Sequence, residues 1–376
     1  MRDFSGYAST EVVTLQDMVH ALIMRSGTTA ATNLSNSRII KAIQSAVRSF
    51  HTKHRWRYYR RQARFKTSPS LTVEIDFDYT GGAEERLVTI TDGDPWPTDA
   101  TYGELWIGED SYRILKRISD TQATLEPEFS PSADLNGVDA IWKRRSYRFQ
   151  RAIHDIEYIK NVTTGAQMYQ MPMGEFATLR SGTPRYFSWQ NHGSEFGASE
   201  IILHPIPTVA ETIEAHAAIL PLVPTIHSVT GTDLSGTSGT TAVTCAGGAF
   251  SSKHIGSILR VSINADAPTQ YKSDDWTFQA FITAVPSATT LTLSEPLPAT
   301  YSSRGYLISS PIDIEASVML KAFEDECFFQ YTKNHNHQGL KDAAAIAQKS
   351  LRDAMVRDNT MCLGQPELFI QPIIEE

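Results

Sequence analysis

The residues with the clearest chemical potential lie in one basic stretch, HTKHRWRYYRRQARFK, at residues 51–66. It holds seven Lys and Arg residues in sixteen positions and no acidic residue, within a chain of formal net charge -8. Cations at this density can bind phosphate groups, and aromatic rings between them can stack on bases. The same side chains can equally pack a core while their charged ends pair with carboxylates. The stretch is therefore a candidate either for nucleic-acid contact or for ion pairing.

A second basic run, KRRSYRFQR, occupies residues 143–151. It directly follows a predicted β module, so we expect the two runs to approach each other where that module joins the rest of the chain. We predict an ion-paired patch at this junction or between subunits, with exposure toward passing DNA as the alternative. Most arginines of the first run should point toward carboxylates, with Trp56 and Tyr58 packed inward. The predicted patch comprises Arg55, Arg57, Arg60, Arg61, Arg64, Lys143, Arg144 and Arg145.

The motifs of common enzyme classes do not occur in the sequence. There is no GxGxxG, GxxxxGK[ST], HExxH or GxSxG pattern. The segment SGTSGTTAV, which starts at Ser235, lacks the lysine of a phosphate loop and predicts a flexible turn. His335 and His337 are too few to hold a metal ion, and the adjacent carboxylates of residues 324–326 indicate a hydrated helix face. We expect a protein that is not an enzyme, with no catalytic residues, metal or cofactor.

The totals are those of a globular protein with two or three domains. Of its 376 residues, 41% are hydrophobic and 20% charged, and no apolar run reaches the about 18 residues of a membrane span. The first residues, MRDFSGYAST, lack the basic start and apolar stretch of a secretory signal, which predicts synthesis in the cytoplasm. Cys245, Cys327 and Cys362 are far apart and odd in number, as expected of free thiols.

Hydrophobic spacing predicts helices toward both ends of the chain and strands between them. A capping box at Thr14 opens a first amphipathic helix, a second follows, and a helical block near the C-terminus breaks at Gly339. Between them, the alternating segments EIILHPIP and AETIEAHAAI should pair as a hairpin turned at Pro205–Thr208. The predicted fold class is α+β: a helical bundle body with a central β-hairpin, two inserted small β-barrel or sandwich-like modules and an extended C-terminal tail.

The two predicted β modules match each other in order along the chain. VTITDG, GELWI and ATLEPEF in the first correspond to VTCAGG, GSILRV and LTLSEPL in the second. We predict two copies of one β unit with the same strand order. The resulting segments are N-terminal helices at 1–66, a first β insert at 67–142, a central body segment at 143–224, a second β insert at 225–310, C-terminal helices at 311–360 and a tail at 361–376.

Several features together resemble the head-to-tail adaptor, or connector, proteins of tailed bacteriophages. Two N-terminal helices are followed by a WRYY step into strands, and a C-terminal helix block ends in LRDAMVRDN. The family's Gly-x-Pro-x-Tyr step is matched by Gly182, Pro184 and Tyr186. A strand ending in Pro-x-Pro is matched by Pro205 and Pro207. The resemblance covers most of the chain outside the β inserts.

This resemblance implies a structural virion protein of the neck, made in the host cytoplasm. Members of the family form a ring, usually a dodecamer, beneath the portal protein, and they receive tail nozzle or tail-tube proteins on the other side. Double-stranded DNA passes through the ring without sequence-specific binding, and no membrane is involved. An extended C-terminus can dock on a portal subunit. The residues expected to do so here are Leu368, Phe369, Ile370, Ile373 and Ile374.

Two other functions remain open at the level of the sequence. A tail-associated carbohydrate-binding or glycan-processing protein would use exposed aromatic side chains such as Trp96, Trp106 and Trp276. A glycosidase also needs two placed carboxylates, and no such pair stands out. A DNA-binding regulator would depend on the basic patch alone.

Overall fold

A computed structural model of the chain shows two compact units. The chain leaves the first unit after Tyr59 and returns to it after Leu220. The structure describes residues 12–26, 33–79, 86–149, 151–172, 181–191, 199–266, 276–335 and 339–360.

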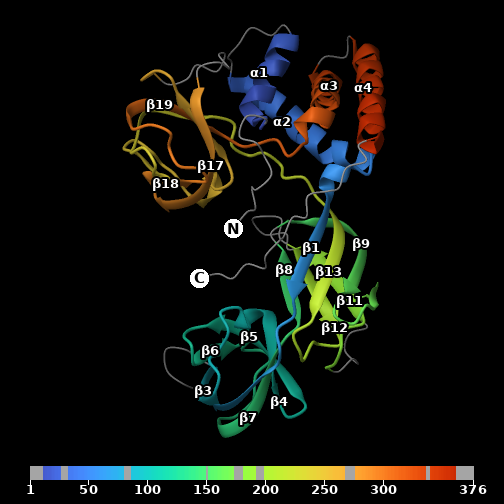
Figure 1. Cartoon of the computed structure of the whole chain (residues 1–376), viewed down its shortest axis with the longest axis vertical. Coiled ribbons are helices and arrows are strands. Elements are labelled where there is room, and N and C mark those ends of the chain that lie inside the picture. The colour runs from blue at the N-terminus through green and yellow to red at the C-terminus, as the bar shows by residue number, and fades with distance from the viewer. Residues whose placement is uncertain are drawn as a thin grey trace. The chain divides into compact units, whose positions relative to one another are not determined.

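The described part of the first unit contains four α-helices that bring sequence-distant segments together (Figure 1). Thr14 N donates to Asp17 Oδ2 at 2.9 Å and Asp17 N donates to Thr14 Oγ1 at 3.3 Å, which is the predicted capping box. Most apolar residues of the first two helices are buried, and Phe50 meets Phe323 edge to face at 5.6 Å. No helix in the described ranges is long and apolar enough to cross a membrane. The helices are α1 (Leu15–Ser26), α2 (Asn33–Phe50), α3 (Ala316–His335) and α4 (Leu340–Thr360).

The described part of the first unit also contains a closed six-stranded barrel with its own core of aliphatic and aromatic side chains. A 3₁₀ turn, Ser252–His254, precedes its third strand. The strands are β14 (Val229–Gly236), β15 (Ala242–Cys245), β16 (Ile258–Ser262), β17 (Trp276–Ser287), β18 (Thr290–Leu293) and β19 (Tyr301–Ser309).

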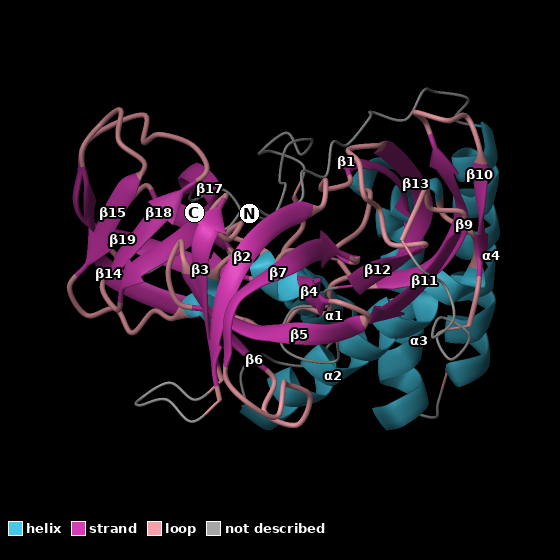
Figure 2. Cartoon of the chain, turned by 90° about the horizontal axis from the view of Figure 1, so that it is seen from below, coloured by secondary structure: helices cyan, strands magenta, loops and turns pink. Residues whose placement is uncertain are grey.

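The second unit contains another closed six-stranded barrel, which Figure 2 shows in magenta. A 3₁₀ turn, Ala100–Tyr102, precedes its third strand. The strands are β2 (Leu71–Asp78), β3 (Leu87–Gly93), β4 (Gly103–Ile107), β5 (Asp110–Arg117), β6 (Gln122–Leu125) and β7 (Leu135–Arg144).

The two barrels have the same strand order. In the barrel of the second unit, neighbouring strands follow the order β2-β3-β6-β5-β4-β7. In the barrel of the first unit, they follow the order β14-β15-β18-β17-β16-β19. Numbering the strands of each barrel from one to six gives 1-2-5-4-3-6 in both. The sequence correspondence between the modules therefore reflects a shared topology, as predicted.

The remaining strands of the second unit form one seven-stranded sheet, in the order β1-β13-β9-β10-β11-β12-β8. Phe65 of the first strand in this order contacts Tyr147 and Phe149 of the last strand, at ring-centroid distances of 4.8 and 5.5 Å. The sheet therefore curls around a single core. Its strands are β1 (Arg60–Lys66), β8 (Ser146–Phe149), β9 (Ile153–Asn161), β10 (Gln167–Gln170), β11 (Tyr186–Asn191), β12 (Ser199–His204) and β13 (Thr212–Ile219).

The predicted helical bundle body is wrong. Strands account for 44% of the structure and helices for 25%. The four helices do pack together, but the central body segment at 143–224, for which only a β-hairpin was expected, contributes six of the seven strands of the curled sheet. Its apolar residues alternate along strands and are buried on the inner face of that sheet.

The predicted central hairpin is also wrong. β12 lies between β11 and β8, whereas β13 lies between β1 and β9. The segment between β12 and β13 is bound by other parts of the unit, since Thr67 N donates to Glu211 O at 2.8 Å and Gly182 N donates to Ile206 O at 3.0 Å. The two strands therefore diverge, although their sequences and the intervening prolines fit a hairpin.

Candidate interaction sites

The first basic run does not begin as the predicted strand. A 3₁₀ turn, Arg57–Tyr59, precedes β1. Trp56 is buried as predicted and stacks on Phe50 at 4.9 Å. The prediction that Tyr58 packs inward is wrong. Because of this turn Tyr59 is buried and Tyr58 only half-buried, and the Tyr59 hydroxyl donates to Asp313 O at 2.7 Å.

Two arginines of this run pair with carboxylates of neighbouring strands. Arg60 Nε lies 2.9 Å from Glu157 Oε1 on β9, and Arg64 Nε lies 2.7 Å from Glu214 Oε2 on β13. Hydrogen bonds from Arg64 and His216 lower the pKa of Glu214 despite its burial. These pairs have the kind of partner that the sequence predicts.

The other arginines of the run have different surroundings. Arg57 Nη2 donates to Asn359 O at 3.1 Å, and its backbone N–H approaches the Asp358 carboxylate at 3.3 Å. Arg61 Nη1 donates to the carbonyl of Arg60 at 3.0 Å. Arg55 is exposed and forms no ion pair with the described part of the chain. Pairing of these residues with another subunit stays a prediction.

In the second basic run, the arginines at the end of β7 and directly after it form ion pairs and hydrogen bonds within the second unit. Arg144 pairs with Asp99, its Nε donates to Ser146 O at 3.0 Å, and its guanidinium lies 4.6 Å from the ring centre of Tyr147. Arg145 Nη1 lies 2.6 Å from Glu104 Oε1. This region therefore joins the barrel to the curled sheet.

Lys143 completes the same junction. Its Nζ donates to Ser181 Oγ at 3.2 Å and lies 4.5 Å from the ring centre of Trp106. Burial lowers the pKa of Lys143, and the nearby Glu104 charge partly opposes that shift. All three cations of residues 143–145 thus serve contacts within the chain.

The two short motifs of the adaptor resemblance form one local structure. Gly182 N donates to Ile206 O at 3.0 Å, and Arg185 N donates to His204 O at 2.7 Å. Tyr186 is the register partner of His204 in the β11–β12 ladder. The Gly-x-Pro-x-Tyr step and the Pro-x-Pro segment therefore lie beside each other, with a cis bond between His204 and Pro205.

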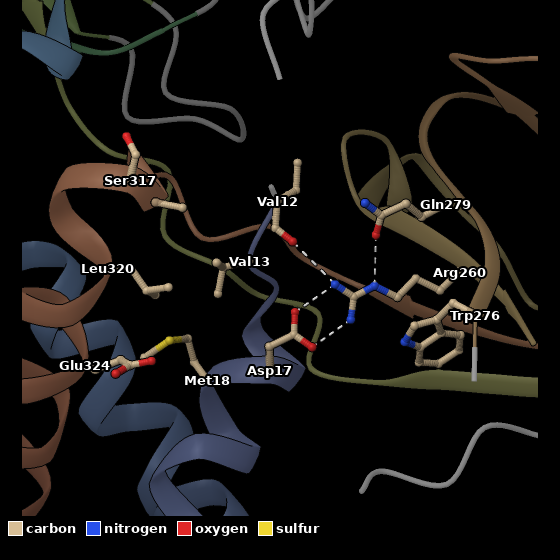
Figure 3. Close-up of a pocket in the computed structure, with 11 residues that line it drawn as sticks. Val12, Val13, Asp17, Met18, Arg260, Trp276, Gln279, Ser317, Leu320 and Glu324 are labelled. Carbon is tan, nitrogen blue, oxygen red and sulfur yellow. Dashed lines mark hydrogen bonds and ion pairs between the residues drawn. The ribbon is translucent and has the colours of Figure 1, made fainter. Parts of the chain in front are cut away.

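A cavity of about 640 Å³ lies in the first unit between the start of α1, the barrel and α3 (Figure 3). Its cation, Arg260, is engaged: Nη1 and Nη2 donate to Asp17 at 2.7 and 2.8 Å, and Nε donates to Gln279 Oε1 at 3.2 Å. Apolar side chains, including Leu320, form much of the wall, and burial raises the pKa of Glu324 at one side. The cavity therefore has a largely apolar wall with two carboxylates, Asp17, which is bound to Arg260, and Glu324.

The Asp17–Arg260 pair predicts a response to acid. Burial raises the pKa of Asp17, but the hydrogen bonds and charge of Arg260, with bonds from Thr14, outweigh it and lower that pKa. A carboxyl with a lowered folded pKa adds stability above its unfolded pKa, about 3.9, which is lost as pH falls through the folded value.

We therefore expect Asp17→Asn to lose about 1 kcal/mol of unfolding free energy at pH 7, a modest value because the Asp17 side chain is 35% exposed. The variant should also lose less further stability than the native chain below about pH 4. Urea denaturation at both pH values measures this, with Asp353→Asn on the exposed side of α4 as control. Parallel pH profiles for native chain and variant would contradict the assignment.

The acidic residues of α3 are not the hydrated face that the sequence suggests. Asp325 and Glu326 are 1% and 3% exposed. Asp325 binds Arg25 and Ser350, while Glu326 binds Lys53 and Ser49. The prediction fails because cations from α1 and from the 3₁₀ turn His51–Lys53 after α2 permit these carboxylates to be buried between helices.

The other residues considered in the sequence analysis form no metal-binding or docking site among the described residues. Within the described ranges no group of three or more His, Cys, Asp or Glu residues could hold a metal ion. His337 and the side chain of His335 lie outside those ranges, as do Leu368, Phe369, Ile370, Ile373 and Ile374. Cys245 and Cys327 are buried free thiols. The predicted turn after Ser235 connects β14 and β15.

Two of the three tryptophans of the glycan alternative are covered by other side chains and cannot stack on a sugar. Trp96 is 1% exposed in the barrel core, and Trp106 lies under Lys143. Trp276 borders the cavity, with its ring centre 5.6 Å from the guanidinium carbon of Arg260.

Comparison with known proteins identifies no relative, since no protein-family model and no curated protein matches the chain.

Proposed function

We propose that this chain is a head-to-tail adaptor of a tailed bacteriophage. It forms a ring, usually dodecameric in such proteins, beneath the portal, joins the capsid to the tail and lets DNA pass. It acts by binding and sealing rather than by turning over a substrate. Its place is the neck of the virion, after synthesis in the host cytoplasm.

One observation carries the proposal. The motifs that resemble the adaptor family, at Gly182–Tyr186 and Pro205–Pro207, are about twenty residues apart but are joined by backbone hydrogen bonds of 3.0 and 2.7 Å. Motifs that matched by chance would have no reason to meet in the fold. The packing of α3 against α1 and α2 gives further support, because the resemblance implies a helical part built from both ends of the chain.

The two barrels suit the contacts that a neck protein must make. Each is closed, so it presents loops and side chains rather than an open strand edge that would pair with other sheets. Each also has its own core, so its outer surface can adapt to a portal or tail protein without loss of the fold. The C-terminal residues at 361–376 are proposed to dock on the portal.

Cryo-microscopy of virions tests the proposal. We expect a ring of this chain on the portal axis, between the portal and the first tail protein. Mass photometry of the purified chain mixed with portal should show multiple copies bound per portal ring, whereas a mixture with capsid protein alone should not. Finding the chain on a capsid face or in a tail fibre would overturn the proposal.

A further inference from the structure

The solvent side of α2 carries several cations and no acid. Arg38, Lys41 and Arg48 are exposed, with the half-buried Ser45 between them. Positions 38, 41, 45 and 48 recur at helical spacing, so they share one face of the helix. No Asp or Glu occurs anywhere between Asp17 and Glu74, although the whole chain is acidic. This basic face is separate from the dense run at residues 51–66.

The three cations have no partner in the described part of the chain. None of them forms an ion pair or a side-chain hydrogen bond there, whereas Lys53, at the end of the same helical segment, binds Glu326. The carboxylates on α3 nearest to this helix are already engaged, since Asp325 binds Arg25 and Glu326 binds Lys53 and Ser49. The positive charge of the face is therefore available to a partner.

The composition of the face favours a polyanion over a protein. Among the described residues of α2, no large hydrophobic side chain is exposed. Protein interfaces need an apolar centre that water leaves, whereas phosphate contacts need only cations and hydroxyl groups. A single-stranded nucleic acid would also need exposed aromatic rings for stacking, and the described positions of this face carry none.

The spacing suits a DNA backbone. Ten residues separate Arg38 from Arg48, which is about 15 Å along the helix axis. Phosphates of one strand follow each other at about 3.4 Å along the duplex axis, so the face spans about four of them. Gln44, which could read a base edge, instead donates to Pro224 O at 2.9 Å.

We propose that the face formed by Arg38, Lys41 and Arg48 binds the phosphate backbone of double-stranded DNA without reading its sequence. The inference rests on charge and exposure within a single chain and not on the proposed function. If both hold, the face is the surface that DNA meets in the neck. Three cations per subunit bind weakly enough to let DNA move past at physiological salt.

Anisotropy of a fluorescein-labelled duplex of arbitrary sequence tests the face, with purified chain titrated at several NaCl concentrations. Three phosphate contacts give a slope of about −2.7 for the logarithm of the association constant against that of the salt concentration. The triple variant Arg38→Gln, Lys41→Gln, Arg48→Gln should lose most of this slope and at least about tenfold of the affinity at the lowest salt. Circular dichroism verifies that the variant keeps its fold.

The control removes equal charge from another exposed helical surface. Lys341, Lys349 and Arg352 on α4 are exposed, and their triple Gln variant should bind DNA like the native chain. Equal loss in both variants would show general charge attraction and overturn the assignment. No DNA binding by the native chain, or unchanged binding by the α2 variant, would also overturn it.

A lipid surface is the competing source of phosphate groups. If the α2 variant lost binding to vesicles of phosphatidylserine and phosphatidylcholine while its DNA binding stayed native, the face would belong to a membrane. The result of the DNA-binding test can be distinguished from the result of the test of the proposed function. A ring on the portal axis with unaltered DNA binding by the α2 variant would end this inference alone, and DNA binding by a chain found outside the neck would end only the adaptor proposal.

Discussion

Replacing Arg144 by Gln should lower the unfolding free energy of the second unit by about 3 kcal/mol or more. Arg144 is 7% exposed, and it connects the last barrel strand to the start of the curled sheet. Its guanidinium pairs with Asp99, donates to Ser146 O and lies over the ring of Tyr147. A shorter neutral amide leaves the Asp99 charge without its partner and removes the contact with the ring, and the loss of one partner of a buried pair is costly.

Urea denaturation followed by tryptophan fluorescence measures this effect. Arg113→Gln in the same barrel is the matched control, because the Arg113 side chain is 65% exposed and lies 3.4 Å from Glu126. It should change the unfolding free energy by no more than about 0.5 kcal/mol. A double-mutant cycle with Asp99→Asn should give a coupling well above that of Arg113 with Glu126. Similar losses for the two arginine variants would refute a special role for Arg144.

Features that depend on nearby residues could be predicted from the sequence. Thr14 and Asp17 are three positions apart, and their mutual hydrogen bonds need only the first turn of a helix. The repeated β module is detectable in the sequence because glycines such as Gly103 and Gly256 recur in the same order relative to apolar runs. In both cases the local chemistry restricts the backbone before any tertiary contact forms.

The partners of the strands could not be predicted in this way. The basic run contains β1, in which Ala63 and Phe65 face the core while Arg64 faces outward. Arg64 meets Glu214, which lies 150 positions further along the chain. Alternation shows which face of a strand is buried, but it does not name the neighbouring strand. The β13 segment consequently fitted a hairpin with β12 equally well.

The surroundings of charged side chains could not be predicted for a related reason. Asp325 looks solvated in the sequence, yet Arg25, 300 positions earlier, pairs with it in the helical part. The cations are densest at residues 51–66, but Arg60 and Arg64 of that run are paired with acids. Arg38, Lys41 and Arg48 of α2, which have no partner among the described residues, are spread at helical spacing and are recognised as one face only when the exposed side of the helix is known.

Gly103→Ala should destabilise the first barrel in the chain by about 3 kcal/mol. Gly103 of β4 lies against the indole of Trp142 on β7, and an added Cβ would overlap the ring. Trp142 is 2% exposed and its Nε1 donates to Ala100 O at 3.0 Å. The ring therefore has no free space to move into, and a shift would also weaken that hydrogen bond.

The second barrel offers a matched variant. Gly231 of β14 lies against Tyr306 of β19 in the same overlapping manner, so Gly231→Ala should open that barrel instead. Hydrogen exchange measured by mass spectrometry separates the two effects. Gly103→Ala should speed exchange in peptides from residues 71–144 and leave those from residues 229–309 unchanged, and Gly231→Ala should do the reverse.

A smaller aromatic ring should relieve the overlap at Gly103. In the background Trp142→Phe, the further loss of unfolding free energy caused by Gly103→Ala should be clearly smaller than in the native chain, because the added methyl group no longer meets an indole. If the loss is the same in both backgrounds, contact with Trp142 is not the cause. Uniformly faster exchange across both barrels in either single variant would likewise show that the two cores do not respond independently.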